Sequence, residues 1–198
     1  MSMAAKRVGE LFASDIHRRI EEVVKVDQTD EQIIREEISE YVVTDALKRH
    51  FLDVLERYRE TPNKPHEGVA IWVSGFFGSG KSSFAKMLGL AAENRKIQGE
   101  SAAELFAEQA GDKKVQVLLK NITEQIPTEA VITDVSTDRG IRTGNQTITE
   151  IMYRQFLQKL GYSPDLDLAE LEIGLEGEGR LEAFKETYRS LYERDWDA

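Results

Sequence analysis

A glycine-rich loop at residues 75–82 constrains the fold of this chain more than any other feature. Its sequence, GFFGSGKS, matches the pattern G-x-x-x-x-G-K-[ST] at every fixed position. Residues 69–74 before it are mostly β-branched and apolar, which predicts a buried strand. Phe84, Met87, Leu88 and Ala91 after it recur at helical spacing. Strand, glycine loop and helix in this order are the context that a phosphate-binding loop requires.

The residue types in the loop suit the chemistry of a bound triphosphate. Gly75, Gly78 and Gly80 allow the positive φ angles that a chain needs to curl around an anion. The amides of residues 78–83 can then point inward at the N-terminus of the following helix. Lys81 is a flexible point charge that can reach the β- and γ-phosphates, and the Ser82 hydroxyl offers a ligand to Mg²⁺.

The sequence therefore predicts a nucleotide site with a bound magnesium ion. Lys81 is the predicted catalytic residue, and Ser82 is the predicted Mg²⁺ ligand. The predicted phosphate-binding residues are Gly75, Phe77, Gly78, Ser79, Gly80, Lys81, Ser82 and Ser83. The competing interpretation is a chance glycine–serine loop, which the flanking strand and helix patterns disfavour.

The composition excludes several classes of protein. The 40% hydrophobic and 31% charged residues are typical of a globular domain, and no apolar run approaches the ~18–20 residues that span a bilayer. The absence of cysteine excludes disulfides and thiolate metal sites. His17, His50 and His66 lie in separate segments without metal-ligand spacing, so each is interpreted as a surface or capping residue. The net charge of −10 disfavours DNA or a membrane as the main partner of this segment.

Residues 1–66 are predicted to form a helical lead-in to the loop. Helices are predicted over most of residues 4–24, after a capping box at residues 29–32, and from Thr44 onward. Pro62 and Pro65 end the last of them. Two interpretations remain open for residues 26–28, which either pack against the core or contact the nucleotide base.

Residues 67–198 are predicted to hold the N-terminal portion of the nucleotide-binding core. A capping box at residues 101–104 and apolar spacing at residues 115–122 predict two helices after the one that follows the loop. Residues 130–135 are the second predicted strand. Further helices are predicted after residue 147, near residues 168–173 and from Leu181, and Gly174, Gly177 and Gly179 are predicted to form a mobile acidic loop.

The two predicted strands indicate an α/β fold with a P-loop NTPase core. Because helical segments separate residues 69–74 from residues 130–135, these strands should run parallel with flanking helices. A two-stranded parallel sheet covers too little area to form an independent core. We therefore expect an incomplete sheet, either because the chain is the first, truncated part of a longer protein or because a partner completes the sheet.

Hydrolysis of a nucleotide requires an acidic residue at a strand end that holds Mg²⁺ through water. Asp134 is a candidate, but Thr133 interrupts the apolar run before it and no second carboxylate follows directly. Asp134 is therefore either this acidic residue or part of a neighbouring strand, with the acidic residue beyond position 198, and the second interpretation is preferred. Arg139 and Arg142 are weaker candidates for phosphate contacts, because loop arginines are usually solvated.

Several stretches resemble the N-terminal part of the BrxC/PglY family, the large ATPases of BREX phage-defence systems. These stretches are VKVDQ at residues 24–28, WVSGFFGSGKS at residues 72–82, Gly161-Tyr162, and Glu182-Ala183-Phe184. The resemblance runs through most of the 198 residues. Only the loop is specific enough to carry residue roles.

The resemblance implies an AAA-like P-loop ATPase core that binds ATP with Mg²⁺. It also implies a cytoplasmic antiviral assembly with other BREX proteins, in which the full-length chain is several times longer and acts on phage DNA. Oligomerisation stays open. Because this sequence lacks the downstream acidic strand and an arginine finger, we expect the segment to bind ATP and to hydrolyse it poorly by itself.

Two other functions compete with this one. A small P-loop kinase uses the same loop but needs an acceptor-binding lid and a full sheet, and neither is visible in the sequence pattern. A nucleotide-dependent scaffold would bind nucleotide without hydrolysis and present its helices to a partner. The sequence contains no guanine-reading N-K-x-D pattern, which weakly favours ATP over GTP.

Overall fold

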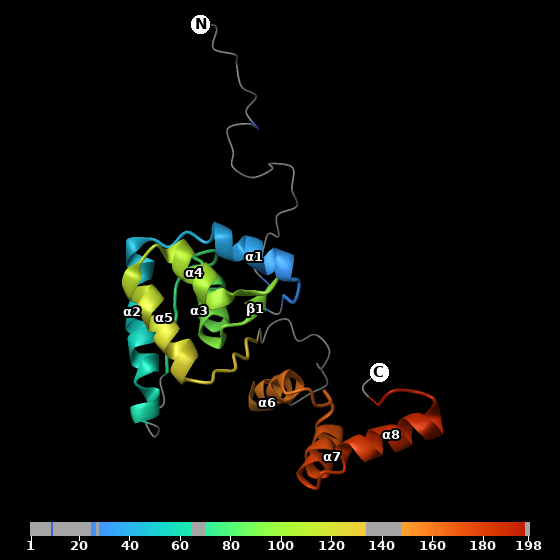
Figure 1. The fold of residues 1–198 in the computed structure, drawn as a ribbon. Helices are drawn as coiled ribbons and strands as arrows, with labels where there is room; N and C mark the ends of the chain where they lie inside the picture. Colours follow the sequence, from blue (N-terminus) through green and yellow to red (C-terminus); the bar gives the residue numbers. More distant parts are fainter. Residues whose placement is uncertain (1–8, 10–24, 27, 65–69, 134–147, 197–198) are drawn as a thin grey trace, which may run out of the picture.

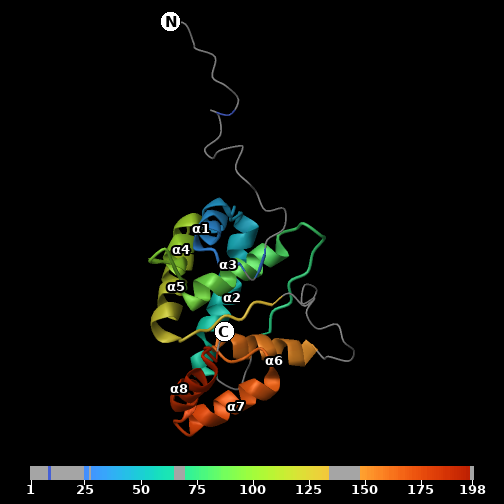
Figure 2. The same cartoon turned by 90° about the vertical axis from the view of Figure 1, so that its right-hand side faces the viewer.

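The computed structural model describes residues 9, 25–26, 28–64, 70–133 and 148–196, and these residues are mostly helical (Figures 1 and 2). The elements are α1 (Glu31–Glu40), α2 (Asp45–Arg59), the 3-10 helix η2 (Thr61–Asn63), α3 (Lys81–Glu93), β1 (Lys96–Ile97), β2 (Glu100–Ser101), α4 (Ala102–Ala110), α5 (Lys113–Gln125), α6 (Ile148–Lys159), α7 (Leu166–Gly177) and α8 (Leu181–Tyr192). None of the described helices is both long and apolar enough to cross a membrane.

The predicted α/β fold with parallel strands is wrong for this structure. In the described ranges, sheet structure is confined to β1 and β2, which form a short antiparallel hairpin. Residues 70–74 and 130–133, from the two predicted strands, have no regular secondary structure, and their main chains make no hydrogen bond to any described residue. A strand requires a neighbour that donates and accepts along its edge. Residue 69 and residues 134–135 lie outside the described residues.

Side-chain caps explain where the helices of the first part begin. Asp30, Thr44, Ser101 and Asp112 each accept a hydrogen bond from main-chain amides in the first turn of α1, α2, α4 and α5. These amides have no partner inside the helix, so each cap removes an unsatisfied donor. Of the capping box predicted at residues 101–104, the structure shows the N-cap bond, from the Glu104 amide to Ser101 Oγ. In the box predicted at residues 29–32, the capping residue is Asp30.

The predicted glycine-rich acidic loop near the C-terminus is mostly wrong. Gly174 lies inside α7 and Gly177 is its last residue, and Asp165 caps this helix through the amides of Asp167 and Leu168. An interior glycine such as Gly174 costs about 1 kcal/mol relative to alanine, but the leucine and glutamate residues around it are good helix formers. The chain turns only afterwards, where Gly179 has a φ of 68°.

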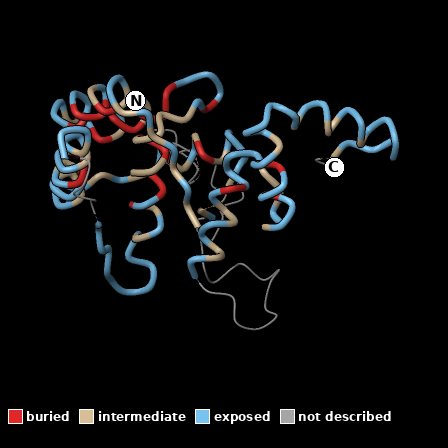
Figure 3. Tube along the Cα trace, turned by 90° about the horizontal axis from the view of Figure 1, so that it is seen from below, coloured by how far each residue is buried: buried red, intermediate tan, exposed pale blue. Residues whose placement is uncertain are grey.

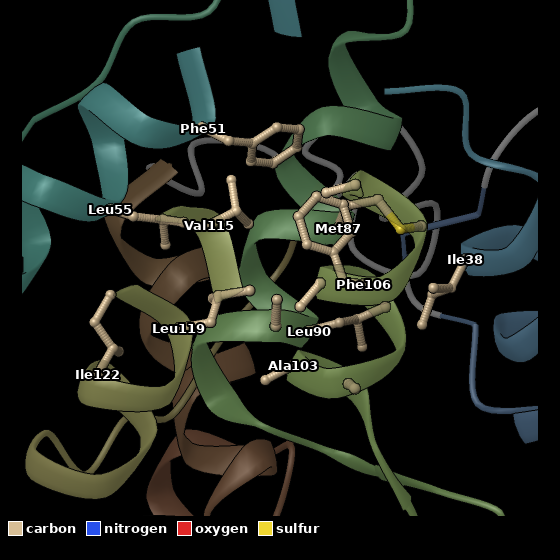
Figure 4. Close-up of a cluster of buried hydrophobic side chains, with 14 of the residues drawn as sticks. Ile38, Phe51, Leu55, Met87, Leu90, Ala103, Phe106, Val115, Leu119 and Ile122 are labelled. Atoms are coloured by element: carbon tan, nitrogen blue, oxygen red, sulfur yellow. The ribbon is translucent and has the colours of Figure 1, made fainter. Parts of the chain in front are cut away.

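Helices α1 to α5 share one hydrophobic core. Figure 3 shows the buried residues gathered where these helices pack together, and Figure 4 shows the side chains that meet there. Phe51 of α2 packs against two other rings in this core, with its ring centroid 4.4 Å from that of Phe84 on α3 and 4.8 Å from that of Phe106 on α4. Aromatic pairs at this separation add about 0.5–1.5 kcal/mol beyond the burial of their area.

One buried ion pair joins α3 to the beginning of the described chain. Lys86 of α3 is fully buried, and its Nζ donates to Glu37 Oε2 of α1 at 2.5 Å and to the Lys25 carbonyl at 2.7 Å. A buried ammonium is tolerated only when it is paired and hydrogen-bonded. The pair therefore fixes α3 against α1.

The C-terminal helices are held by a second, smaller set of contacts. Trp196 packs edge-on against Phe184 and Tyr188 of α8, and its indole N–H donates to Glu172 of α7. Lys159 at the end of α6 pairs with Glu93 at the end of α3 and lies 3.5 Å from Glu129. These ion pairs link α6 to the helices of the first part.

The aromatic centre of the core can be tested by truncating one phenylalanine. Phe51→Ala is expected to lower the free energy of unfolding by about 3–5 kcal/mol, because it leaves a cavity among Tyr41, Phe84 and Phe106. Urea unfolding followed by circular dichroism measures this change. The matched control is Phe77→Ala, since Phe77 is 99% exposed where Phe51 is 1% exposed, and its effect should stay below ~0.5 kcal/mol. Equal effects of the two variants would contradict the core described above.

Candidate phosphate-binding site

The glycine loop makes a tight turn between residues 70–76 and α3. The Ser79 amide donates to the Phe76 carbonyl at 3.2 Å, and Gly78 and Gly80 have φ angles of 78° and 84°. Only glycine adopts this left-handed region without strain. A Cβ atom at position 75 would lie 2.6 Å from Ser79 Oγ, so the two ends of the turn approach closely.

Lys81 folds back over the loop from the first position of α3. Its Nζ donates to the Phe76 carbonyl at 2.7 Å. Its Cδ would lie 3.9 Å from a Cβ atom at position 75, so the lysine side chain crosses the turn from the helix to the end of the extended segment. The ammonium group is thus held beside the loop by a neutral carbonyl, which a phosphate oxygen could replace.

The main-chain amides at the start of α3 are available to a ligand. Gly80 is the N-cap of α3 and has no side chain that could accept from the helix amides. The first helical bond runs from the Phe84 amide to the Gly80 carbonyl at 2.9 Å. Within the described chain, the amides of Gly78, Gly80, Lys81, Ser82 and Ser83 have no hydrogen-bond partner. Free amides at the N-terminus of a helix favour a bound anion.

A groove of about 560 Å³ lies beside the loop. Its walls are residues 71–76, the loop residues Ser79, Gly80 and Lys81, and one side of α2 that includes His50 and Asp53. Pockets for small ligands typically measure ~300–1,000 Å³. The groove therefore offers enough space for a nucleotide next to the free amides.

The structure brings the predicted phosphate-binding residues together in one turn. Residues 75–80 and Ser82 are exposed, and Lys81 and Ser83 are half-buried. The Phe76 and Phe77 side chains point into solvent almost completely, so any contact of Phe77 with phosphate would come from its main chain. Among the described residues, the Ser82 hydroxyl has no hydrogen-bond partner.

Other predicted residues lie away from the loop or outside the described residues. Asp134, Arg139, Arg142, His17 and His66 are among the latter. The Gln28 side chain accepts from the Asp30 amide at 3.0 Å, and the Gln28 amide donates to the Lys25 carbonyl. These bonds build the entry to α1. Residue 27 lies outside the described residues, and both interpretations of residues 26–28 stay predictions.

The sequence interpretation missed the contribution of α2 to the site. His50 and Asp53 are exposed residues of α2 that line the groove, and Asp53 also pairs with Arg57 one turn later at 3.1 Å. Each residue looks like an ordinary surface residue of an amphipathic helix. The packing of Phe51 on Phe84 brings this side of α2 near the loop.

Clusters of acidic and histidine side chains that could hold a metal ion by themselves do not occur among the described residues. A Mg²⁺ ion bound with a triphosphate needs few protein ligands, because phosphate oxygens and water fill most of its coordination sites. No protein-family model and no solved structure matches this chain.

The left-handed conformation of Gly80 can be tested with one methyl group. Gly80→Ala is expected to cost about 1 kcal/mol of stability, because alanine is strained at a φ of 84° although space around it is open. Gly174→Ala is the matched control, since Gly174 lies in α7 with equally open space, and alanine there should add up to ~1 kcal/mol. Urea unfolding of both variants measures the difference. A Gly80→Ala protein as stable as the parent would mean that the loop does not take this conformation.

Proposed function

We propose that residues 75–83 bind the phosphate groups of ATP together with Mg²⁺. The observation that carries the proposal is the row of unpaired amides at the start of α3, with the Lys81 ammonium held across the same turn. In this proposal, amides of residues 78–83 bind phosphate oxygens, Lys81 neutralises the outer phosphates, and Ser82 supplies its hydroxyl to Mg²⁺.

The electrostatics of the loop support an anionic ligand despite the net charge of −10. The 13-residue helix α3 directs the positive end of its dipole at the loop. The Lys81 ammonium donates to the neutral Phe76 carbonyl. If a phosphate oxygen took the place of this carbonyl, the lysine would have a charged acceptor. Hydrogen bonds to charged groups contribute about 1.5–3 kcal/mol each, against about 1 kcal/mol for neutral pairs.

The choice of ATP and the wider biological assignment rest on the resemblance to the BrxC/PglY family. On that basis the segment is the ATP-binding part of a BREX-type anti-phage ATPase that works in the cytoplasm with other BREX proteins. The loop geometry supports phosphate binding in general and does not select the base. We infer ATP from the specific WVSGFFGSGKS form of the loop.

The site assignment predicts a large effect of Lys81 on nucleotide affinity. Lys81→Ala should weaken the binding of a fluorescent ATP analogue with Mg²⁺ by about 1.5–3 kcal/mol, or about ten- to a hundredfold in Kd. The matched control is Lys120→Ala, because Lys120 is an exposed lysine of α5 whose nearest carboxylate, that of Glu124, lies 3.9 Å away. Its Kd should match that of the parent protein. Equal affinities of the parent and Lys81→Ala proteins would remove the assignment.

A second measurement separates an ATPase from a nucleotide-dependent scaffold. The chain of 198 residues is expected to show a rise in its melting temperature with ATP and Mg²⁺, but very slow release of phosphate. Rapid turnover that Lys81→Ala abolishes would show that the acidic residue for Mg²⁺ lies within this chain. Transfer of phosphate to a small-molecule acceptor would instead indicate the kinase alternative.

A further inference from the structure

Trp72 is a large aromatic residue that the rest of the described chain leaves uncovered. It is 91% exposed, and within the described ranges its indole N–H has no hydrogen-bond partner and its ring has no aromatic neighbour. Tryptophan is usually well buried, because its large apolar surface is costly to expose to water. An exposed tryptophan that lines a groove therefore indicates a surface for a flat, partly apolar group.

Trp72 lies on the groove side of the extended segment. Successive residues of an extended chain point to opposite sides. Ile71 and Val73 also line a cavity between this segment and residues 128–133, whereas Trp72 lines the groove and not that cavity. The indole therefore borders the same groove as the glycine loop.

The spacing between Trp72 and the glycine loop suits a nucleotide. Gly75, where the turn begins, follows Trp72 by three residues, so their Cα atoms lie at most ~11 Å apart. In a nucleotide, one ribose separates the base from the phosphates. A ligand whose phosphates bind the amides of residues 78–83 therefore has its base within reach of the indole. Phe76 also lines the groove, but it lies inside the turn, beside the phosphate end.

Helix α2 adds both apolar and polar groups to this groove. Leu47 and Val54 contribute apolar surface, and His50 and Asp53 contribute polar side chains. A nucleotide base has apolar faces and polar edges, so it needs a surface on which to stack and polar groups beside it. The groove offers the first on Trp72 and the second on α2.

We propose that Trp72 stacks on the base of the bound nucleotide and makes the groove selective for purine nucleotides. This inference rests on the proposed binding of a triphosphate by residues 75–83, and it adds the residue that recognises the base. A purine has two fused rings and covers more of the indole than a pyrimidine does. Stacking on an aromatic side chain is therefore stronger for a purine.

The test compares the Mg²⁺ complexes of ATP, CTP and inorganic tripolyphosphate by calorimetry. Trp72→Ala should weaken ATP binding at least about fivefold and leave tripolyphosphate binding unchanged, because the loop stays intact. The parent protein should bind ATP more tightly than CTP, and this preference should shrink in Trp72→Ala. Tyr192→Ala is the matched control, because Tyr192 is a 62% exposed aromatic residue of α8 that does not line the groove. Its affinities should equal those of the parent protein.

Trp72→Phe adds a readout that a purely structural role would not change. Phenylalanine keeps an aromatic face, so most of the ATP affinity should be retained. The chain contains two tryptophans, Trp72 and Trp196, and stacking of a base quenches tryptophan fluorescence. ATP should therefore quench the parent protein and not Trp72→Phe, whose remaining tryptophan packs on α8. Tripolyphosphate should quench neither protein.

The outcomes separate this proposal from the proposed function. Equal affinities of the parent protein for ATP and tripolyphosphate, or an equal loss of both in Trp72→Ala, would overturn the role of Trp72 alone. A loss of ATP binding in Phe76→Ala that Trp72→Ala does not show would do the same. Tripolyphosphate binding that Lys81→Ala leaves unchanged would overturn the phosphate site and, with it, this proposal. If circular dichroism shows that Trp72→Ala is misfolded, the fluorescence of Trp72→Phe still decides.

Discussion

The packing of Phe84 on Phe51 is the interaction on which the candidate phosphate-binding site depends. Phe84 follows Lys81 by less than one helical turn, and its ring centroid lies 4.4 Å from that of Phe51. It is the first buried residue of α3, so it fixes the start of the helix and with it the position of the glycine loop. Phe84 and Val54 also line the nucleotide groove. Part of the lining of the groove therefore belongs to the core.

The start of α3 differs from the starts of the helices around it. Side-chain oxygens cap α1, α2, α4 and α5, and each consumes amides of its own first turn. Gly80 at the start of α3 has no such oxygen and takes a left-handed conformation. A self-capped helix cannot offer the same amides to an anion. Glycine at the N-cap costs only roughly a few tenths of a kcal/mol relative to a capping side chain, and it leaves the amides free for a phosphate.

The sequence predicts the local features of this structure and fails on those that need distant partners. The caps at Thr44 and Ser101, the stripe on α5 and the turn at residues 75–80 depend on residues within one or two helical turns of each other. Sheet formation depends on which segments lie side by side. The β-branched residues at 69–74 and 130–135 do not determine which segment becomes the neighbour of each strand. The contribution of Asp53 to the groove was missed for the same reason, because it follows from contacts between α2 and α3.

The anchoring of α3 contrasts with that of the segment that leads into the loop. Phe84 holds α3 to α2, and the buried Lys86 holds it to Glu37 of α1 and to the Lys25 carbonyl. A ligand at the loop would therefore meet amides that are already fixed, and fixed donors bind without a further cost of ordering. Residues 71–74 lack main-chain bonds to the rest of the described chain, and they end where Gly75 begins the turn. The helix α3 is thus the anchored half of the site, and the extended segment at residues 71–74 is the half without main-chain anchors.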